Sequence, residues 1–497
     1  MNMRNRKFEK VALIEPGAPG IHVFSKYKLP RLGLPILGAV IKRELAISPK
    51  IYFQDLKKLD WKEILSSDLV GISTITSTAP IAYTIVKRIK SERPDLPVVL
   101  GGPHVTFIPE EGLLKGADFV VRGEGEETFV ELIRCLEGDG DFARVAGLSY
   151  LQDGTCCNNP PREHIMDLSS LPWPDLTLIE GFEKSKIIPV LTSRGCPFDC
   201  TFCSVTSMFG NRYRFRSTDD VLAELEMLYG KRPKGIFFFY DDNFTASPSR
   251  TKELLKRMKE AGITPRWTAQ ARVDVARDPE MMELMRETNC AFLYLGLESI
   301  NPKTLDSYRK HQTVEEIVEA IQIIHENGIR VHGMFVLGSD EDTIETVRET
   351  VHFAKSTKID TVQFLILTPI PGSEVYEKMR AEKRIFVDDW SKFSGHHVVF
   401  YPKNMPPFKL QKEAAVKAMR KFYSLWQCWK LGLLFRWGDV AVRVYAHRAI
   451  RKWKHFNRYF LSELRHRYKA EKAHRKQIEK DKKEVLEKAV GEEKHAV

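Results

Sequence analysis

Short runs of apolar and β-branched residues alternate with helical stretches over the first 150 residues, and no other feature constrains the fold as strongly. One of the helical stretches runs from Ala79 to Arg93. Strands that are apolar throughout and joined by helices predict a parallel, doubly wound α/β sheet of the Rossmann-like type over residues 1–155. Such sheets bind ligands at the carboxyl ends of their strands. The predicted strands are residues 10–16, 68–74, 96–102 and 117–123.

The same alternation returns over residues 185–404, where we expect a (β/α)6 partial TIM barrel. Between the two α/β regions lies a stretch rich in Pro, Asn and Ser, residues 156–184, which is predicted to be a linker because its prolines oppose a regular element. The six predicted strands of the barrel are residues 187–193, 235–241, 266–272, 292–298, 329–338 and 361–367, with helices at 218–230, 248–262, 278–289, 313–327 and 342–357.

Positive charge is concentrated in the third region, residues 405–497, which is predicted to be helical and basic. From Lys409 onward there are 24 Lys and Arg against 10 Asp and Glu, a net +14, so the rest of the chain sums to −3. Beyond residue 465 about half of the residues are charged and few are apolar, which predicts a solvated helix or a disordered end.

An amphipathic basic helix near residues 440–460 has three interpretations. Its apolar face packs on the barrel, it lies on an anionic membrane, or it binds nucleic acid through phosphates. Packing is the simplest, and nearby tryptophans favour a membrane over nucleic acid. With no apolar run of 18 residues and no signal-peptide pattern, we expect a cytoplasmic protein, with peripheral contact to the inner face of the membrane as an option. The tryptophans are Trp426, Trp429, Trp437 and Trp453.

Three of the eight cysteines fall within eight residues of the stretch LTSRGCPFDCTFCSV (191–205), directly after a predicted strand. The spacing Cys-x3-Cys-x2-Cys supplies thiolates for three irons of a [4Fe–4S] cluster and leaves the fourth iron open to a small molecule. Structural zinc is the alternative, but zinc takes four ligands, usually from paired Cys-x2-Cys motifs, and the sequence has no second pair. The predicted ligands, and the core of the catalytic site, are Cys196, Cys200 and Cys203.

With an aromatic residue before its last cysteine, this motif resembles the signature of the radical S-adenosylmethionine (SAM) superfamily. The resemblance implies that the reduced cluster cleaves SAM to a 5′-deoxyadenosyl radical, which abstracts hydrogen from an unactivated carbon. Further likenesses follow at strand ends: YDDNF (240–244) for the SAM amino group, WTAQARVD (267–274), GLES (296–299), and more weakly GMFVLG (333–338) and TPIPGS (368–373). The implied SAM contacts are Phe202, Asp241, Asp242, Gln270, Arg272, Glu298 and Gly338.

Four motifs of the first domain together resemble the cobalamin-binding domain fused to many radical SAM proteins: PRLGLPILGA (30–39), GIST (71–74), GGPHVT (101–106) and RGEGEETF (122–129). The pattern Asp-x-His-x-x-Gly, whose histidine ligates cobalt in other cobalamin domains, is absent. We therefore expect cobalamin to bind without a histidine ligand, although His22 and His104 are candidates. The implied cobalamin contacts are Gly33, Thr74, Thr76, Gly101, Gly102, Thr106, Gly123 and Glu124.

The cofactors implied are a [4Fe–4S] cluster, SAM and cobalamin, and the implied reaction is methyl transfer to an unactivated carbon. Ring formation or rearrangement in lipid, isoprenoid or tetrapyrrole biosynthesis is the alternative, and a non-catalytic cobalamin or redox sensor is a more distant one. A methylthiotransferase is disfavoured because only Cys135 precedes residue 156, where that class needs three cysteines. The expected partners are a small molecule, lipid-like as one option, and an electron donor such as flavodoxin or ferredoxin, but not nucleic acid.

Overall fold

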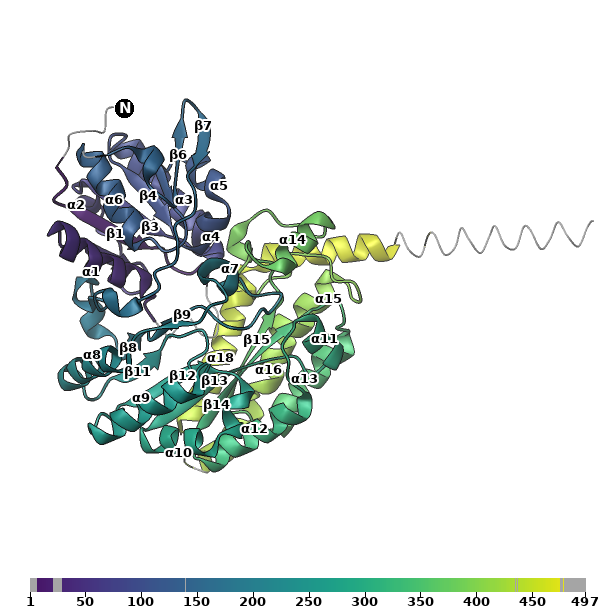
Figure 1. The fold of residues 1–497 in the computed structure, drawn as a ribbon. Helices are drawn as coiled ribbons and strands as arrows, with labels where there is room; N and C mark the ends of the chain where they lie inside the picture. Colours follow the sequence, from purple (N-terminus) through teal and green to yellow (C-terminus); the bar gives the residue numbers. More distant parts are fainter. Residues whose placement is uncertain are drawn as a thin grey trace, which may run out of the picture.

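A computed structural model describes residues 7–20, 29–138, 140–433, 435, 437–473 and 477. Figure 1 shows two α/β units side by side: the N-terminal domain in purple and blue, and the larger unit in teal and green. The C-terminal helices, in yellow, lie along the second unit. The three-part α/β fold predicted from the sequence is therefore confirmed.

The N-terminal sheet has the strand order β2-β1-β3-β4-β5-β6-β7, and its first five strands are parallel. This order, with a switch point between β1 and β3, is that of a doubly wound domain that binds ligands at the switch. The strands are β1 (Val11–Glu15), β2 (Lys50–Phe53), β3 (Leu69–Ser73), β4 (Val98–Gly101), β5 (Phe119–Val121), β6 (Leu148–Gln152) and β7 (Thr155–Asn158).

Alternation along the strands explains why helices cover both faces of this sheet. In β1, Leu13 joins the core beneath α1 (Gly33–Leu45) and α6 (Glu126–Glu137), whereas Ala12 and Ile14 join the core beneath α3 (Ala79–Glu92). Because successive side chains of a strand point to opposite faces, a strand that is apolar at every position needs a helix on each side. The doubly wound prediction rests on this pattern.

The hairpin β6–β7 adds two antiparallel strands to one edge of the sheet, and the sequence did not predict it. Since β7 ends at Asn158, the predicted boundary at residue 155 falls inside a strand. The remainder of the predicted linker contains only short 3-10 turns, and it packs closely: the Glu180 N–H donates to the Ile51 carbonyl at 2.9 Å, and the Trp173 indole to Asp220 at 2.6 Å.

The second unit is a six-stranded parallel sheet in the order β15-β14-β13-β12-β11-β8, so β8 and β15 are its edges and the barrel is partial, as predicted. Helices alternate with the strands along the chain. The strands are β8 (Ile187–Val190), β11 (Ile236–Phe239), β12 (Arg266–Ala271), β13 (Cys290–Glu298), β14 (Arg330–Leu337) and β15 (Thr361–Ile366). The helices are α8 (Thr218–Lys231), α9 (Pro248–Glu260), α10 (Pro279–Glu287), α12 (Val314–Glu326) and α13 (Ile344–Ser356).

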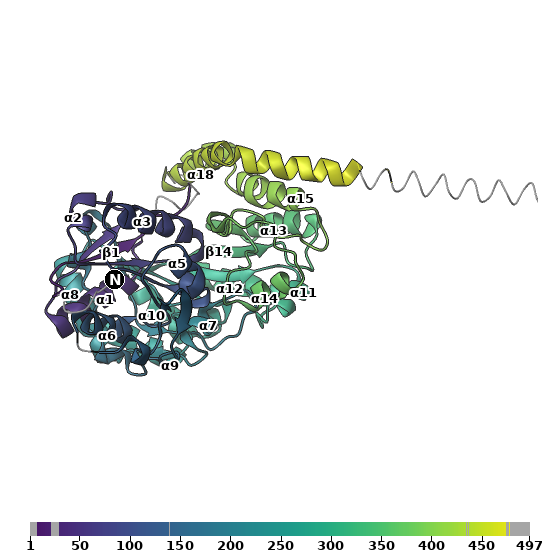
Figure 2. The same cartoon turned by 90° about the horizontal axis from the view of Figure 1, so that it is seen from above.

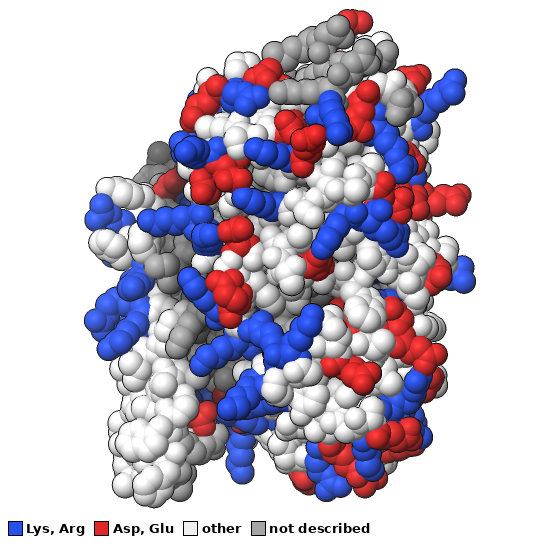
Figure 3. All heavy atoms as spheres, turned by 90° about the vertical axis from the view of Figure 1, so that its left-hand side faces the viewer, with Lys and Arg blue, Asp and Glu red and all other residues white. Residues whose placement is uncertain are grey.

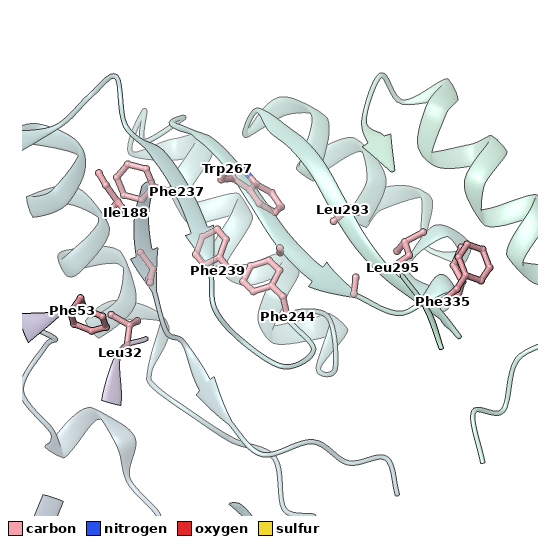
Figure 4. Packing of buried hydrophobic residues seen from close by; sticks show 14 of the residues in the cluster. Leu32, Phe53, Ile188, Phe237, Phe239, Phe244, Trp267, Leu293, Leu295 and Phe335 are labelled. Atoms are coloured by element: carbon pink, nitrogen blue, oxygen red, sulfur yellow. The ribbon is translucent and has the colours of Figure 1, made fainter. Parts of the chain in front are cut away.

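Large aromatic side chains fill the space between this sheet and its helices, as Figure 4 shows. The rings of Phe239 and Phe244 stack with their centroids 4.4 Å apart, and Trp267 meets both edge-on. The buried indole N–H of Trp267 donates to the Thr288 carbonyl at 2.8 Å, which removes the cost of burying an unsatisfied donor.

The C-terminal region packs on the barrel through one face of its helices and lies along its side in Figure 2. The Tyr423 hydroxyl accepts from the Val362 N–H and donates to the Val362 carbonyl, both at 2.9 Å. The helices are α15 (Pro407–Gln411), a π-helix (Lys412–Ala418), α16 (Met419–Phe422), α17 (Cys428–Leu433) and α18 (Trp437–Phe456). Most of the charged end predicted to be solvated, residues 474–476 and 478–497, lies outside the described residues. Among the described helices, none combines the length and the apolar character needed to cross a bilayer.

Candidate active site

The cysteine loop follows the carboxyl end of β8, on the side of the barrel where the parallel strands end. It lies between β9 (Ser193–Arg194) and α7 (Val205–Phe209), and β9 pairs antiparallel with β10 (Arg214–Phe215). Gly195, just before the first cysteine, has φ +84°, and a Cβ there would lie 2.9 Å from the Arg212 carbonyl oxygen. Only glycine therefore fits this turn.

Hydrogen bonds to the chain beyond β13 and to α14 (Glu374–Ala381) hold the loop in place. The Thr201 N–H donates to the Tyr308 carbonyl at 3.3 Å, and the Val375 N–H donates to the Thr201 carbonyl at 3.0 Å. Phe202, a predicted SAM contact, packs edge-on against Tyr308 with a centroid distance of 4.8 Å. The loop is therefore anchored mainly by its backbone and by Phe202.

The three thiols lie within one partly buried loop, and burial raises the pKa of each, that of Cys203 to about 12. Thiols with raised pKa values stay protonated at neutral pH until a metal displaces the proton. No described group of three His, Cys, Asp or Glu side chains converges on a single ion. A cluster needs no such convergence, because each thiolate binds a different iron. Three sulfur donors at a strand's carboxyl end thus fit a [4Fe–4S] cluster.

Glu298 ends β13 beside this loop and forms a buried ion pair with Lys310, whose Nζ lies 2.8 Å from Oε1. Its backbone is in the left-handed region, at φ +59°, which is rare for a residue other than glycine and is typical of functional sites. A Cβ at Gly296 would lie 2.6 Å from the same Oε1 and 2.7 Å from the Lys310 Nζ, so the glycine leaves room for this ion pair. Sequence reasoning missed Lys310, which the structure pairs with this predicted SAM contact.

Arg272 and Gln270 lie at the end of β12. The Arg272 guanidinium stacks on the Phe198 ring of the cysteine loop, 3.9 Å from the ring centroid, and also donates to the Lys310 carbonyl. The Gln270 amide donates to the Asp241 carbonyl at 3.2 Å. These two predicted SAM contacts therefore brace the loop and the end of β11.

The two aspartates after β11 differ in environment. Asp241 is fully buried and accepts hydrogen bonds from the hydroxyls of Thr192, at 2.8 Å, and Ser193. Asp242 lines a cavity, to which its side chain is exposed. Desolvation by the protein around that cavity raises the pKa of Asp242 to about 7, and the negative charge of the neighbouring Asp241 carboxylate adds to this effect. The structure thus offers Asp242, rather than Asp241, to a ligand.

If the Asp242 carboxylate receives the SAM ammonium group, SAM affinity will depend on pH with a predictable sign. Below a pKa of about 7 the carboxyl is protonated and cannot pair with the cation. The dissociation constant should therefore rise as pH falls, by up to about tenfold per pH unit. Equilibrium dialysis of SAM against the anaerobic, cluster-loaded protein would measure this dissociation constant as a function of pH. Asp242→Asn should bind weakly without this dependence, and Asp199→Asn, which changes an exposed carboxylate of the cysteine loop, should behave like the native chain. A native affinity that does not change with pH would contradict the assignment.

Gly338, predicted to lie near adenine, has φ +99° after β14 and donates its N–H to Asp342 at 2.8 Å. A Cβ there would lie 2.5 Å from Leu410 Cδ2 of α15, so the glycine allows the C-terminal region to approach the end of the strand.

A cavity of about 380 Å³ lies between the two domains, at the carboxyl ends of β1, β3 and β4, which is the switch point of the N-terminal sheet. At Gly33 and Gly123 a Cβ would meet no described atom within 4 Å, so both glycines border open space. From the first domain the lining includes Leu13, Gly33, Gly71, Gly101, Gly102, Gly123 and Glu124; from the barrel it includes Ser193, Arg194, Ser204, Met208, Tyr240 and Asp242. One cavity thus joins predicted cobalamin contacts to a predicted SAM contact.

The predicted threonines are not in this lining. Thr74 is fully buried and its hydroxyl donates to the Gly101 carbonyl at 3.0 Å. The Thr106 hydroxyl donates to the Gly102 carbonyl at 2.9 Å and accepts from the Gly123 N–H at 3.0 Å. Thr76 is also buried, in a 3-10 turn. These side chains shape the strand-end loops that border the cavity, and the structure does not bring them to it.

His104 is fully buried beneath Trp390, with ring centroids 5.1 Å apart, and it is not part of the lining described above. His22 lies outside the described residues. The described lining therefore contains no histidine.

The Gly102 backbone makes a specific prediction about stability. Its φ is +93°, and a Cβ would lie 2.5 Å from the Thr74 carbonyl oxygen. We expect Gly102→Ala to lower the free energy of unfolding by about 2–3 kcal/mol, since a strained backbone costs of order 1–3 kcal/mol and the overlap adds to it. Urea unfolding measures this. Gly230→Ala, in the last turn of α8 and with open space around its Cβ, should be neutral or slightly stabilising. Equal effects of the two substitutions would refute the strain argument.

Buried ion pairs join the first domain to the cysteine loop. Arg194 donates to Glu124 at 2.8 Å and pairs with Glu126, while Arg214 donates to both oxygens of Glu124 at 3.0 and 2.9 Å. Burial acts to raise the pKa of the Glu124 carboxyl, but the two guanidinium groups outweigh burial, so the pKa is lowered. Glu124 was predicted to contact cobalamin. It borders the cavity, and its carboxylate also fixes β9, from which the cysteine loop starts, to the N-terminal sheet.

Comparison with known families agrees with this geometry. Residues 59–133 match the B12 binding domain, and residues 190–354 match the radical SAM superfamily. An uncharacterized methyltransferase of Pyrococcus horikoshii is 34% identical over 406 residues, which cover 79% of this chain and 87% of that protein. Bacteriochlorophyllide d C-12(1)-methyltransferase of Chlorobaculum tepidum is 32% identical over 361 residues, covering 72% and 75%.

Two solved structures share the fold. Radical SAM methyltransferase TsrM from Kitasatospora setae, with cobalamin and a [4Fe–4S] cluster bound, has a TM-score of 0.65 and 19% identity over 76% of this chain and 75% of that one. The cobalamin-dependent radical SAM enzyme OxsB, with aqua-cobalamin bound, has a TM-score of 0.69 and 16% identity over 91% and 76%.

This chain belongs to the radical SAM superfamily, among its members with an N-terminal B12 binding domain. The radical SAM domain implies a [4Fe–4S] cluster and SAM, and the B12 binding domain supports cobalamin as the third cofactor. The residues present fit these groups: three thiols on one loop, an acidic residue and a buried ion pair close to it, and a glycine-bordered cavity between the domains.

Proposed function

We propose that this protein is a cobalamin-dependent radical SAM methyltransferase that acts on an unactivated carbon of a small molecule. The observation that carries the proposal is the shared cavity, which the strand ends of the B12 binding domain and the residues around the cysteine loop line together. Transfer between two cofactors requires them to be close and oriented, and a single cavity lined by both domains would allow that. When bound, the cofactors would supply the radical and the methyl group.

In this proposal the chain's own residues hold and orient the reactants. The ion pairs of Glu124 with Arg194 and Arg214 fix the two domains relative to each other. Asp242 and the Glu298–Lys310 pair would receive the polar groups of SAM, because opposite charges and hydrogen-bonding groups suit its ammonium, carboxylate and ribose. Apolar residues such as Leu13 and Met208 in the lining would limit access of water to the reacting carbon.

The electron donor is proposed to dock where the cysteine loop reaches the surface. There Arg309 pairs with Asp199 of the loop at 3.6 Å and with Glu374 at 2.8 Å, and all three side chains are exposed. A small redox protein such as flavodoxin or ferredoxin would approach the cluster along this charged surface. A cytoplasmic location, where such donors occur, forms part of the proposal.

A cyclase is the second candidate, because the anaerobic magnesium-protoporphyrin IX monomethyl ester cyclase of Cereibacter sphaeroides is 30% identical over 375 residues, covering 72% of this chain and 60% of that protein. Methyl-labelled SAM separates the two functions. The reconstituted protein, with reductant and a small-molecule extract, should yield a product that carries the labelled methyl group. Formation of 5′-deoxyadenosine together with an unlabelled, oxidised or ring-closed product would favour the cyclase. Absence of any product that depends on SAM would refute both.

A further inference from the structure

The segment from Leu425 to Trp437 presents large apolar side chains to the outside of the molecule. The relative exposure is 68% for Trp426, 70% for Leu433, 83% for Phe435 and 63% for Trp437, and Leu425 and Trp429 are also exposed. Six of the fourteen exposed large apolar side chains of the described chain lie in this stretch. Contiguous exposed apolar surface of this kind marks an interaction site. We call these six residues the aromatic knob.

The contacts that attach the C-terminal region to the barrel are made by other residues. Before the knob, Phe422 and Tyr423 are buried against β15, where the Phe422 and Phe364 rings meet at 6.3 Å. After the knob, Ala449, Ile450 and Trp453 of α18 are buried. The amphipathic face predicted near 440–460 is thus mostly used in packing, which agrees with the simplest of the three interpretations. The exposed apolar surface lies just before it.

Basic residues flank the knob in sequence. Between Lys417 and Arg458 the sequence has eleven Lys or Arg and one acidic residue, Asp439, which pairs with Arg330 at 2.6 Å. Figure 2 places α18 on the side of the molecule that lies at the left of Figure 3. On that side, Figure 3 shows mainly blue spheres above a protruding lobe that is nearly free of charged side chains. The exposed basic residues on the two sides of the knob in sequence are Arg420, Lys421, Arg448, Arg451, Lys452, Lys454 and Arg458.

We propose that the aromatic knob inserts into the interface of an anionic lipid bilayer while the flanking Lys and Arg bind lipid headgroups. Tryptophan concentrates at membrane interfaces because one part of its ring is apolar and the other polar. Basic residues beside an apolar face are attracted to anionic lipids. A second copy of this chain suits the surface less, because a symmetric interface would bring two positively charged rims together. The attachment is independent of the reaction that the enzyme catalyses.

Vesicle flotation of the full chain tests the proposal. The chain should float with vesicles of phosphatidylcholine and phosphatidylglycerol, and at least about tenfold less with phosphatidylcholine alone or in high salt, which screens the charges. Replacing Trp426, Trp429 and Trp437 together by serine should lower partitioning at least about tenfold, because the apolar area removed is large. The matched control replaces three exposed apolar residues elsewhere, Leu114, Leu151 and Val318, by serine and should float like the native chain.

Tryptophan fluorescence gives a second readout that does not depend on flotation. Lipids with brominated acyl chains should quench the native chain and should quench the triple tryptophan variant much less. Of the five tryptophans that remain in the variant, Trp267 and Trp453 are buried, and Trp61, Trp173 and Trp390 are half-buried and lie outside the C-terminal region. Binding that is equal for the native chain and this variant, or no binding to anionic vesicles, would overturn the proposal. So would light scattering that shows a native dimer and a monomeric tryptophan variant, because the knob would then be an interface between copies.

Discussion

Cys200→Ala is expected to fold normally, to assemble no [4Fe–4S] cluster and to form no 5′-deoxyadenosine. With two thiolates left, the loop cannot hold a cubane whose fourth iron must remain open. Because the cofactor supplies the radical chemistry, SAM cleavage should fall at least about a thousandfold. The fold should persist, since Thr201 and Phe202 anchor the loop without the thiols. Iron content, visible absorbance and mass-spectrometric detection of 5′-deoxyadenosine would measure these effects.

The control for this substitution is Cys157→Ala. Cys157 is a partly exposed residue of β7 in the other domain and has no part in the proposed chemistry. The Cys157→Ala variant should retain the iron content of the native chain and its formation of 5′-deoxyadenosine. An iron content of Cys200→Ala equal to that of the native chain would contradict the assignment of the cluster ligands.

The second large effect is expected for Glu124→Ala, which should lower the free energy of unfolding by about 3–5 kcal/mol, the usual cost of removing one partner from a buried ion pair. The substitution leaves Arg194 and Arg214 buried without their shared carboxylate. Because the folded state lowers the pKa of Glu124, the stabilisation is present above the ordinary glutamate pKa and is lost as pH falls through the lowered value. Urea unfolding of native and variant chains at neutral and acidic pH would show both effects.

Glu127→Ala is the matched control for Glu124→Ala. Glu127 lies three residues further along and pairs with Arg162 at 2.8 Å, but its side chain is 60% exposed. Exposed pairs contribute about 0–1 kcal/mol, so little change is expected. If the two variants lost the same stability, the buried network would not be what joins the domains.

Hydrophobic periodicity was sufficient to predict most of the fold. Most strands of the two parallel sheets carry apolar runs because they are covered on both faces, and such runs are conspicuous in sequence. The short edge strand β2, KIYF, is an exception and was not predicted. The hairpin β6–β7 escaped prediction for the opposite reason. Its residues, LSYLQ and TCCN, are short, mixed in polarity and partly exposed, so they lack the signal on which the prediction depended.

The cysteine loop could be predicted because three ligands close in sequence produce a fixed spacing. Partners that are distant in sequence could not be paired. Arg194 meets Glu124 across 70 residues, and Lys310 meets Glu298 from a loop with no recognisable pattern. Adjacent residues were equally hard to separate: Asp241 and Asp242 are identical in type, and only the turn after β11 decides which is buried and which faces the cavity.

The central claim is that the cavity between the domains holds cobalamin beside the radical SAM site, and retention of corrin by Gly33→Trp tests it most directly. Gly33 begins α1, lines the cavity and has open space at its Cβ, so tryptophan should fill the cavity without disturbing the fold. After loading with hydroxocobalamin and gel filtration, the native chain should retain corrin in stoichiometric amount, whereas Gly33→Trp should retain little and keep its iron. Equal retention by the two chains, or none by the native chain, would contradict the account.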